Sequence, residues 1–322
     1  MKKILAYRFS AFGDVAMIVP VLKEFLAQNP DTEIVFVSRK NFADLFDGVE
    51  RLTFRGVNLD DYKGVFGLRK LTKELNKEYN PKYVADLHDV LRSKILTILF
   101  KLRRKKTATL DKGRTEKKLL TRKENKVKKP LKSTTERYAD VFRKLGFTLK
   151  LSHQLFPKSQ QKSGIGFAPF AQHEGKMLPI EKSLDLVKVL SQKNEVLLFG
   201  GGKKEVEVLS KWEQELDNVT SLAGKLSLKE ELKKISELKV MISMDSANMH
   251  LASLVGTRVV SVWGATHYFA GFLGYGQSEK DIVEIKNLEC RPCSVFGNKP
   301  CYRGDYACLN QIEISEILKK IE

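Results

Sequence analysis

The sequence lacks any apolar run long enough to cross a membrane. Hydrophobic residues make up 42% of its 322 residues, yet no stretch approaches the roughly 18 consecutive apolar residues that a transmembrane helix needs. Lys2 and Lys3 precede a short apolar stretch, as at the start of a signal peptide. Because Arg8 and Asp14 interrupt that stretch and no small-residue cleavage site follows, we expect a cytoplasmic protein.

Acidic residues are scarce in one stretch, residues 101–132, which holds 15 Lys and Arg against 3 Asp and Glu. This stretch supplies most of the formal net charge of +18. It contains no aromatic residue for stacking on single-stranded nucleic acid, and no helix-turn-helix or zinc-finger spacing. It is either a solvated loop or a surface for an anionic partner such as membrane head groups or a phosphorylated substrate. We expect no nucleic-acid partner.

Cysteine is rare, and its four copies are clustered: Cys290, Cys293, Cys301 and Cys308. In a cytoplasmic chain, clustered cysteines with a C-x-x-C pair favour a tetrahedral zinc site over disulfides. The spacing is not that of a standard zinc finger. Structural zinc and reduced free thiols therefore both remain open interpretations, with disulfides or redox chemistry as a third.

Two common nucleotide-binding fingerprints are absent. Three glycines, Gly200, Gly201 and Gly202, follow an apolar run and could let backbone amides approach a ligand. Their spacing is neither the Walker pattern nor GxGxxG. The sequence thus gives little support to ATP hydrolysis or NAD binding.

Short β-rich runs alternate with amphipathic helical stretches along the chain, which is typical of parallel sheets covered by helices. We predict strands at residues 3–8, 33–38, 83–86, 164–168, 195–199, 240–243 and 258–263, and helices at residues 14–28, 133–145, 180–190, 204–216, 228–235 and 247–254. Pro20 should kink or break the first helix.

The alternation stops near residue 154 and restarts near residue 164. We predict an α/β protein with a first Rossmann-like domain at residues 1–156, a linker at residues 157–163 and a second Rossmann-like domain at residues 164–322. A cleft should separate the domains, with ligands bound beyond the carboxyl ends of the strands.

Polar and small residues follow several predicted strands, where such ligands would be met. After the first strand come Arg8, Ser10, Gly13 and Asp14; the aspartate could equally be a helix cap. Lys176 follows a later strand and could meet a phosphate as a point charge, although alone it is a surface lysine.

A further segment, from Asp245 to His250, starts the helix that follows the strand at residues 240–243. Unpaired amides and the helix dipole at such a start favour a diphosphate. Thr266 ends the next strand and would line the same cleft. A helix cap for Asp245 and a buried core position for His250 are the simpler interpretations.

Together, these segments resemble glycosyltransferase family 9, the ADP-heptose:lipopolysaccharide heptosyltransferases. The resemblance covers nearly the whole chain in order. The family's motifs correspond to Arg8, Ser10, Gly13, Asp14, Val15, Pro20 and Leu22; to Asp86, Arg92 and Ser93; to Leu222, Gly224, Ser227, Leu228 and Glu230; and to Asp245, Ser246, Ala247, His250 and Ala252. Ala247 stands where the family usually has glycine.

The resemblance implies the GT-B fold, in which two Rossmann-like domains face a central cleft, and an inverting transfer that requires no metal or other cofactor. It implies that Asp14 is the general base and that Lys176 stabilises the leaving ADP. It assigns nucleotide-sugar binding to Glu205, Leu226, Asp245, Ser246, Ala247, His250 and Thr266, and acceptor binding to Arg8, Ser10, Gly13 and Arg92.

The implied donor is a nucleotide sugar, most simply ADP-heptose, and the implied acceptor is an anionic glycolipid of the lipopolysaccharide-core type. Residues 101–132 would then attract the enzyme to the cytoplasmic face of the inner membrane as a peripheral protein. Three alternatives remain open: a GT-B glycosyltransferase with another nucleotide sugar, a GT-B epimerase, and a non-enzymatic basic surface binder.

Overall fold

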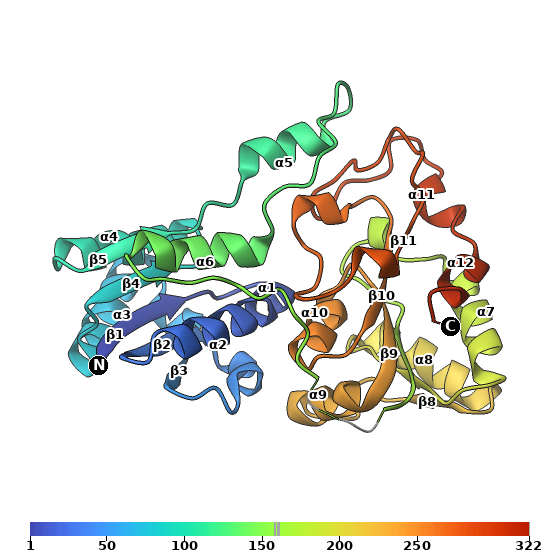
Figure 1. Cartoon of the computed structure of the whole chain (residues 1–322), viewed down its shortest axis with the longest axis horizontal. Helices are drawn as coiled ribbons and strands as arrows, with labels where there is room; N and C mark the ends of the chain where they lie inside the picture. The colour runs from blue at the N-terminus through green and yellow to red at the C-terminus, as the bar shows by residue number, and fades with distance from the viewer. Residues whose placement is uncertain (158, 160–161, 322) are drawn as a thin grey trace. The chain divides into compact units, whose positions relative to one another are not determined.

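The computed structural model describes residues 1–157, 159 and 162–321. The chain divides into two compact units, each built on its own parallel sheet (Figure 1). Unit 1 comprises Met1–Gly113 and Lys132–Ser152, and unit 2 comprises Arg114–Leu131 and the chain from His153 onward. The prediction of an α/β protein with two Rossmann-like domains is confirmed, because each sheet has the strand order of that fold.

Unit 1 contains a five-stranded sheet in the order β3-β2-β1-β4-β5, and all its neighbouring strands are parallel. The strand order reverses between β1 and β4, so the loops after these two strands flank the switch point where such sheets bind ligands. Its strands are β1 (Lys2–Tyr7), β2 (Thr32–Arg39), β3 (Leu52–Val57), β4 (Tyr83–Asp86) and β5 (Lys106–Thr109). Its α-helices are α1 (Phe12–Ala16), α2 (Ile18–Gln28), α3 (Gly64–Tyr79), α4 (Leu91–Leu102) and α6 (Thr134–Lys144), with 3-10 helices at Lys40–Phe46 and Leu59–Tyr62.

Helices cover both faces of this sheet because alternate side chains of each strand point to opposite faces. Leu5 and Tyr7 of β1 share a buried cluster with residues of α3 and α4. On the other face, Phe25 of α2 and Phe142 of α6 pack with ring centroids 4.5 Å apart, and Figure 1 shows these two helices side by side.

The first predicted helix is indeed broken, three residues before Pro20. Helix α1 ends at Ala16, and α2 begins at Ile18. Pro20 consequently lies in the first turn of α2, where its missing N–H removes no helical hydrogen bond. The break makes α1 a separate short turn that carries Asp14.

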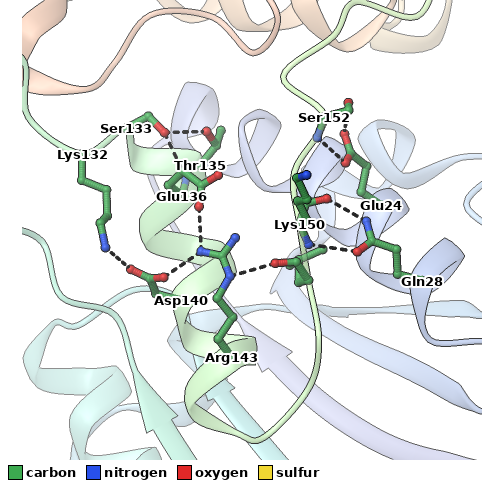
Figure 2. Close-up of polar contacts among 11 residues, drawn as sticks. Glu24, Gln28, Lys132, Ser133, Thr135, Glu136, Asp140, Arg143, Lys150 and Ser152 are labelled. Carbon is green, nitrogen blue, oxygen red and sulfur yellow. Dashed lines mark hydrogen bonds and ion pairs between the residues drawn. The ribbon is translucent and has the colours of Figure 1, made fainter.

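The return segment of unit 1, residues 132–152, has polar contacts both within itself and to α2, which Figure 2 shows. Ser133 caps α6 by accepting from the backbone N–H of Glu136. Arg143 donates to the carboxylates of Glu136 and Asp140 at 2.6 and 2.8 Å. Further along, the backbone N–H of Ser152 donates to Glu24 of α2 at 2.8 Å. The contacts of Ser133 and Arg143 stabilise α6 internally, and the contact to Glu24 holds the end of the segment against α2.

Unit 2 contains a six-stranded parallel sheet in the order β11-β10-β9-β6-β7-β8. Its switch point lies between β6 and β9. The strands are β6 (Ser163–Ala168), β7 (Val196–Leu198), β8 (Val219–Ser221), β9 (Leu238–Met244), β10 (Val259–Trp263) and β11 (Ile282–Glu284). Strands β6, β9 and β10 are almost entirely buried, as expected for the centre of a sheet covered on both faces.

Most of the helices of unit 2 follow its strands in a regular alternation. They are α5 (Arg114–Thr121), α7 (Ile180–Ser191), α8 (Lys203–Glu215), α9 (Leu228–Glu237), α10 (Ala247–Leu254), α11 (Ala307–Asn310) and α12 (Ile314–Leu318), with 3-10 helices at Glu174–Lys176, Tyr268–Ala270 and Glu279–Asp281. The core of the unit combines residues of β6, β7, β9 and β10 with residues of α7, α8, α11 and α12. The C-terminal helices therefore belong to the same folded body as the sheet.

The structure divides the basic stretch, residues 101–132, between the two units. Arg114–Leu131 clusters with unit 2 although the sequence-based boundary places it in the first domain. The Lys117 ammonium lies 4.1 Å from the centroid of the Phe272 ring, and the backbone N–H of Leu131 donates to the Phe269 carbonyl. These contacts involve residues more than 130 positions away, which sequence periodicity does not reveal.

Two further sequence-based expectations concern the linker and membrane spans. Residues 158, 160 and 161 of the predicted linker, 157–163, lie outside the described residues, and residue 163 already belongs to β6. Among the helices that the structure describes, none has the length and apolar character needed to cross a membrane.

Candidate functional site

The predicted site residues of unit 1 lie on the two loops at its switch point. The first loop follows β1 and carries Arg8, Ser10 and, in α1, Gly13 and Asp14. The second follows β4 and leads into α4 with Arg92 in its first turn. Since β1 and β4 are adjacent parallel strands, both loops leave the same edge of the sheet.

Arg8 and Asp14 form an ion pair, with Nη2 of the arginine 2.7 Å from Oδ2 of the aspartate. The arginine side chain is 7% exposed and the aspartate side chain 26% exposed. Arg8 also donates to the Leu87 carbonyl at 2.8 Å, and its guanidinium lies over the Tyr138 ring, 5.7 Å from the centroid. The cation is fixed in the interior, and the carboxylate is the more accessible member of the pair.

Ser10 lies beside a buried histidine of the β4 loop. Its Oγ is 3.3 Å from Nε2 of His88. Burial, followed by the positive charges of Arg8 and Lys112, lowers the pKa of His88 to about 3. The imidazole is therefore neutral near pH 7 and adds no charge next to the Arg8–Asp14 pair.

Buried Asp86 at the end of β4 organises the second loop. Its Oδ1 accepts from the backbone N–H groups of His88 and Asp89 at 2.9 and 3.0 Å, and Thr97 donates to its Oδ2 at 3.2 Å. These bonds fix the turn that leads to half-buried Arg92. This short turn, held by the Asp86 side chain, thus sets the start of α4.

In unit 2, Lys176, Asp245 and Thr266 meet, although the chain separates them widely. Lys176 Nζ lies 2.9 Å from Asp245 Oδ2, and the Thr266 hydroxyl donates to the same carboxylate oxygen at 2.8 Å. The lysine side chain is 16% exposed and the aspartate 6%. Here the carboxylate is buried and the cation is the more accessible partner.

The segment after Asp245 begins α10 as predicted. Ser246 is the N-cap residue, and its Oγ lies 3.2 Å from Oγ of Ser243. Ala247 starts the helix and has no positive φ, so alanine fits where the family usually has glycine. His250 is buried one turn further along α10.

The loops that carry Lys176 and Thr266 touch through their backbones. The Ala265 N–H donates to the Gly175 carbonyl at 2.7 Å. A Cβ at position 264 would lie 2.6 Å from the same carbonyl oxygen, so a side chain there would force the loops apart. Buried Arg291 adds hydrogen bonds to the carbonyls of Gly264 and Thr266 at 2.6 and 3.0 Å.

Glu205 and Leu226, predicted to contact the nucleoside, lie on neighbouring loops of the same sheet edge. Glu205 of α8 accepts from the backbone N–H groups of Gly201 and Gly202 at 2.8 and 3.3 Å, so its carboxylate caps the helix and orders the glycine turn. Leu226 is half-buried directly before the Ser227 cap of α9. Their contacts to a nucleotide remain a prediction.

The four cysteines are free thiols that line one small cavity of about 10 Å³, together with Ala265, Arg291, Tyr302, Arg303, Asp305, Tyr306 and Ala307. Within residues 1–157, 159 and 162–321, no three His, Cys, Asp or Glu side chains already stand in a metal-binding arrangement. The zinc prediction is therefore not confirmed, although the sequence correctly indicates that the cysteines cluster.

The structure thus brings the predicted residues together in two groups, Arg8 with Asp14 in unit 1 and Lys176 with Asp245 and Thr266 in unit 2. Sequence reasoning missed the roles of His88, Tyr138 and Arg291 in these groups. His88 lies between Asp86 and Arg92 of the second motif, but Tyr138 and Arg291 carry no local signal because their partners are distant in the chain.

Comparison with known proteins identifies the family. Residues 68–299 match glycosyltransferase family 9 (heptosyltransferase), and the chain belongs to this family. Lipooligosaccharide heptosyltransferase 2 of Campylobacter jejuni is 26% identical over 184 residues, which cover 56% of this chain and 56% of that protein. The matched part therefore spans little more than half the length of this curated relative.

Solved structures agree on the fold. A glycosyltransferase family 9 protein from Veillonella parvula has a TM-score of 0.75 at 18% identity, covering 99% of this chain and 96% of its own. Escherichia coli heptosyltransferase WaaC, solved with ADP-2-deoxy-2-fluoro heptose, has a TM-score of 0.67 at 17% identity, covering 92% of this chain and 97% of its own. At this identity the likeness establishes the GT-B class of fold.

Proposed function

We propose that this protein is an inverting, metal-independent glycosyltransferase that transfers heptose from ADP-heptose to an acceptor of the lipopolysaccharide-core type. Family membership supports the reaction class, and the E. coli structure with a fluorinated ADP-heptose supports the donor. The observation that carries the proposal is the Lys176–Asp245–Thr266 cluster at the switch point of the unit 2 sheet.

Unit 2 would bind the diphosphate of the donor. The accessible ammonium of Lys176 provides a positive charge. The backbone N–H groups of Ser246 and Ala247 lie at the N-terminus of α10, where they can donate hydrogen bonds to an anion. Buried Asp245 holds the lysine in place, and Thr266 fixes Asp245. Such preorganised donors stabilise the charge that develops on a leaving diphosphate.

Unit 1 would supply the base. Asp14 would accept the proton of the acceptor hydroxyl while that oxygen forms a bond to the anomeric carbon and the bond from this carbon to the ADP oxygen breaks. A single displacement from the opposite face inverts the anomeric configuration. Buried Arg8 orients the Asp14 carboxylate, and Ser10, Gly13 and Arg92 remain the proposed acceptor contacts. Positioned general bases typically contribute about 10²–10⁴-fold to a rate.

The donor proposal is tested by calorimetric titration of ADP, UDP, GDP and NAD into the wild type and Asp245→Asn. We expect ADP to bind preferentially and the substitution to weaken its binding, because the amide no longer pairs with Lys176. Asp185→Asn is the matched control, since Asp185 forms an exposed ion pair with Lys188 in the same unit. A preference for UDP or GDP would contradict ADP-heptose as the donor and favour another nucleotide sugar. Absence of any nucleotide binding would contradict the proposal that the protein is a glycosyltransferase.

We further propose that the basic stretch attracts the enzyme to an anionic membrane surface. Lys118, Lys128 and Lys129 are exposed on the part of the stretch that belongs to unit 2. Each such cation contributes about 1 kcal/mol near an anionic surface, so replacing all three by Gln should weaken binding by roughly a hundredfold.

Sedimentation with phosphatidylglycerol vesicles and with neutral phosphatidylcholine vesicles, at low and high salt, measures this effect. Binding that is specific for the anionic vesicles and sensitive to salt is expected. Equal binding to both kinds of vesicle, or none to either, would contradict the membrane proposal.

A further inference from the structure

The Cys-rich segment, residues 290–308, lies against the loops that carry the proposed donor site. The backbone N–H of Cys293 donates to the Ala265 carbonyl at 3.1 Å, directly before Thr266. The Tyr306 hydroxyl donates to the Glu174 carboxylate at 3.2 Å, two residues before Lys176. The segment therefore contacts both loops through residues adjacent to its cysteines.

The packing between this segment and Lys176 is tight. Gly297 has a φ of +75°, and a Cβ at this position would lie 2.7 Å from Cγ of Lys176. A substitution there would both strain the backbone and displace the lysine stem. The position of the Lys176 ammonium consequently depends on where the segment lies.

Little secondary structure holds the segment itself. Between Glu284, where β11 ends, and Ala307, where α11 begins, no helix or strand is present in this fully described stretch. Its four thiols instead converge on one cavity of about 10 Å³, which is comparable to one water-sized sphere. A cross-link between these thiols would therefore restrict the motion of a loop that contains no helix or strand.

The surroundings suit an anionic centre. Arg291 and Arg303 line the same cavity as the four cysteines. The Lys123 ammonium lies 5.5 Å from the centroid of the Tyr302 ring, which also lines that cavity. Four thiolates around one divalent ion carry a net charge of −2, which three neighbouring cations would offset. Lys123 comes from the basic stretch, so that stretch also contributes to the surroundings of the cavity.

We propose that Cys290, Cys293, Cys301 and Cys308 bind one metal ion as four thiolates, and that this cross-link positions Lys176 and Thr266. A soft, tetrahedral sulfur set selects Zn²⁺ or iron among the common metals. Binding requires the thiols to rotate toward the shared cavity and lose their protons. The metal takes no part in sugar transfer, and only the positioning half of the proposal rests on the proposed function.

Elemental analysis of the freshly purified full chain tests the site itself. We expect about one zinc or iron per chain, with visible absorption only if the ion is iron. Cys301→Ser should lower the metal content severalfold, whereas Lys299→Ser, at an exposed position of the same segment, should leave it unchanged. Absence of both metals, with four thiols titrated in the native protein or with disulfides found by mass spectrometry, would overturn the site.

Chelation of the wild type followed by ADP titration tests the positioning role without any variant. Removal of the metal should weaken ADP binding by about tenfold, the effect expected when one hydrogen bond to a charged group is misplaced, and adding the metal back should restore it. Unchanged ADP affinity after metal loss would overturn the positioning role. If the metal is present but ADP binds neither form, the donor proposal fails while the metal site stands.

Discussion

The two switch-point sites use the same pair of chemical groups in opposite ways. In unit 1 the cation of the Arg8–Asp14 pair is the more buried member, at 7% against 26% exposure. In unit 2 the carboxylate of the Lys176–Asp245 pair is the more buried member, at 6% against 16%. Unit 1 therefore presents a carboxylate, as a general base requires, and unit 2 presents an ammonium, as a diphosphate site requires.

The fixed partner explains why each site needs two charged residues. A buried charge is costly unless it is paired and hydrogen-bonded. Arg8 meets this requirement through Asp14 and the Leu87 carbonyl, and Asp245 meets it through Lys176 and Thr266. In both sites the buried residue restricts the orientation of the accessible one. Substitutions of one member at a time can therefore separate the orienting role from direct contact with the substrate.

The largest effect is expected from Asp14→Asn. If Asp14 accepts the proton of the acceptor, its loss should slow sugar transfer by about 10²–10⁴-fold. The measurement is ADP release from ADP-heptose in the presence of a lipopolysaccharide-core acceptor. Asp31→Asn, which removes an exposed ion pair with Lys2 in the same unit, should have no effect. A rate within threefold of the wild type would exclude Asp14 as the base.

Lys176→Met should reduce the rate of ADP release by about 10²–10³-fold, because the variant lacks the fixed positive charge that would stabilise the leaving ADP. Methionine retains most of the apolar stem, which packs against Gly297. Lys188→Met is the control, since this lysine forms an exposed ion pair in α7. An unchanged rate would mean that the accessible cation of unit 2 does not face the diphosphate.

Buried His88 in unit 1 and half-buried His267 in unit 2 should make stability depend on pH. Burial is the main cause that lowers the pKa of His88 to about 3 and that of His267 to about 4, against about 6.5 in an unfolded chain. The unfolded state therefore binds more protons below pH 6.5. The free energy of unfolding should therefore be highest above pH 6.5. Below this pH, each of the two histidines should lower it by up to about 1.4 kcal/mol per pH unit.

Urea denaturation of the wild type and His88→Gln between pH 7.5 and about 5 measures this slope. The variant should have a shallower decrease, and replacing the exposed His153 should leave the slope as in the wild type. Identical slopes for the wild type and His88→Gln would contradict the buried, neutral state of His88.

The smallest effect is expected in the partly exposed contacts of α6 (Figure 2). Burial raises the pKa of Asp140, but hydrogen bonds from Lys132 and Arg143 lower it by more, so the net pKa is below its ordinary value of 3.8. Asp140→Asn should cost only about 0.5 kcal/mol at pH 7, because exposed ion pairs contribute little. The difference should persist above pH 4 and disappear as the pH falls below it; a difference that grows in acid would contradict this assignment.

The sequence predicts the interior of each sheet and misses its edges. The seven predicted strands coincide closely with β1, β2, β4, β6, β7, β9 and β10, whereas the four missed strands, β3, β5, β8 and β11, are the edge strands of the two sheets. Interior strands are apolar on both sides and read as continuous apolar runs. Edge strands such as β5, with the sequence KTAT, are short and polar, as edges that avoid aggregation tend to be.

For the sites, the sequence indicates which loops matter but not which atoms pair. The motifs identify Arg8, Asp14, Lys176, Asp245 and Thr266, and the parallel sheets explain why these residues meet. In unit 1, for example, the orientation of the ion pair depends on contacts of Arg8 to Tyr138 and to the Leu87 carbonyl, which are distant in the chain. Pattern alone therefore could not reveal which member of each pair is buried.

Calorimetric titration of ADP into the wild type, Asp14→Asn and Lys176→Met tests the division of roles most directly. We expect Asp14→Asn to bind ADP as tightly as the wild type and Lys176→Met to bind it at least about tenfold more weakly. Equal affinity in all three proteins, or a loss confined to Asp14→Asn, would contradict this division of roles.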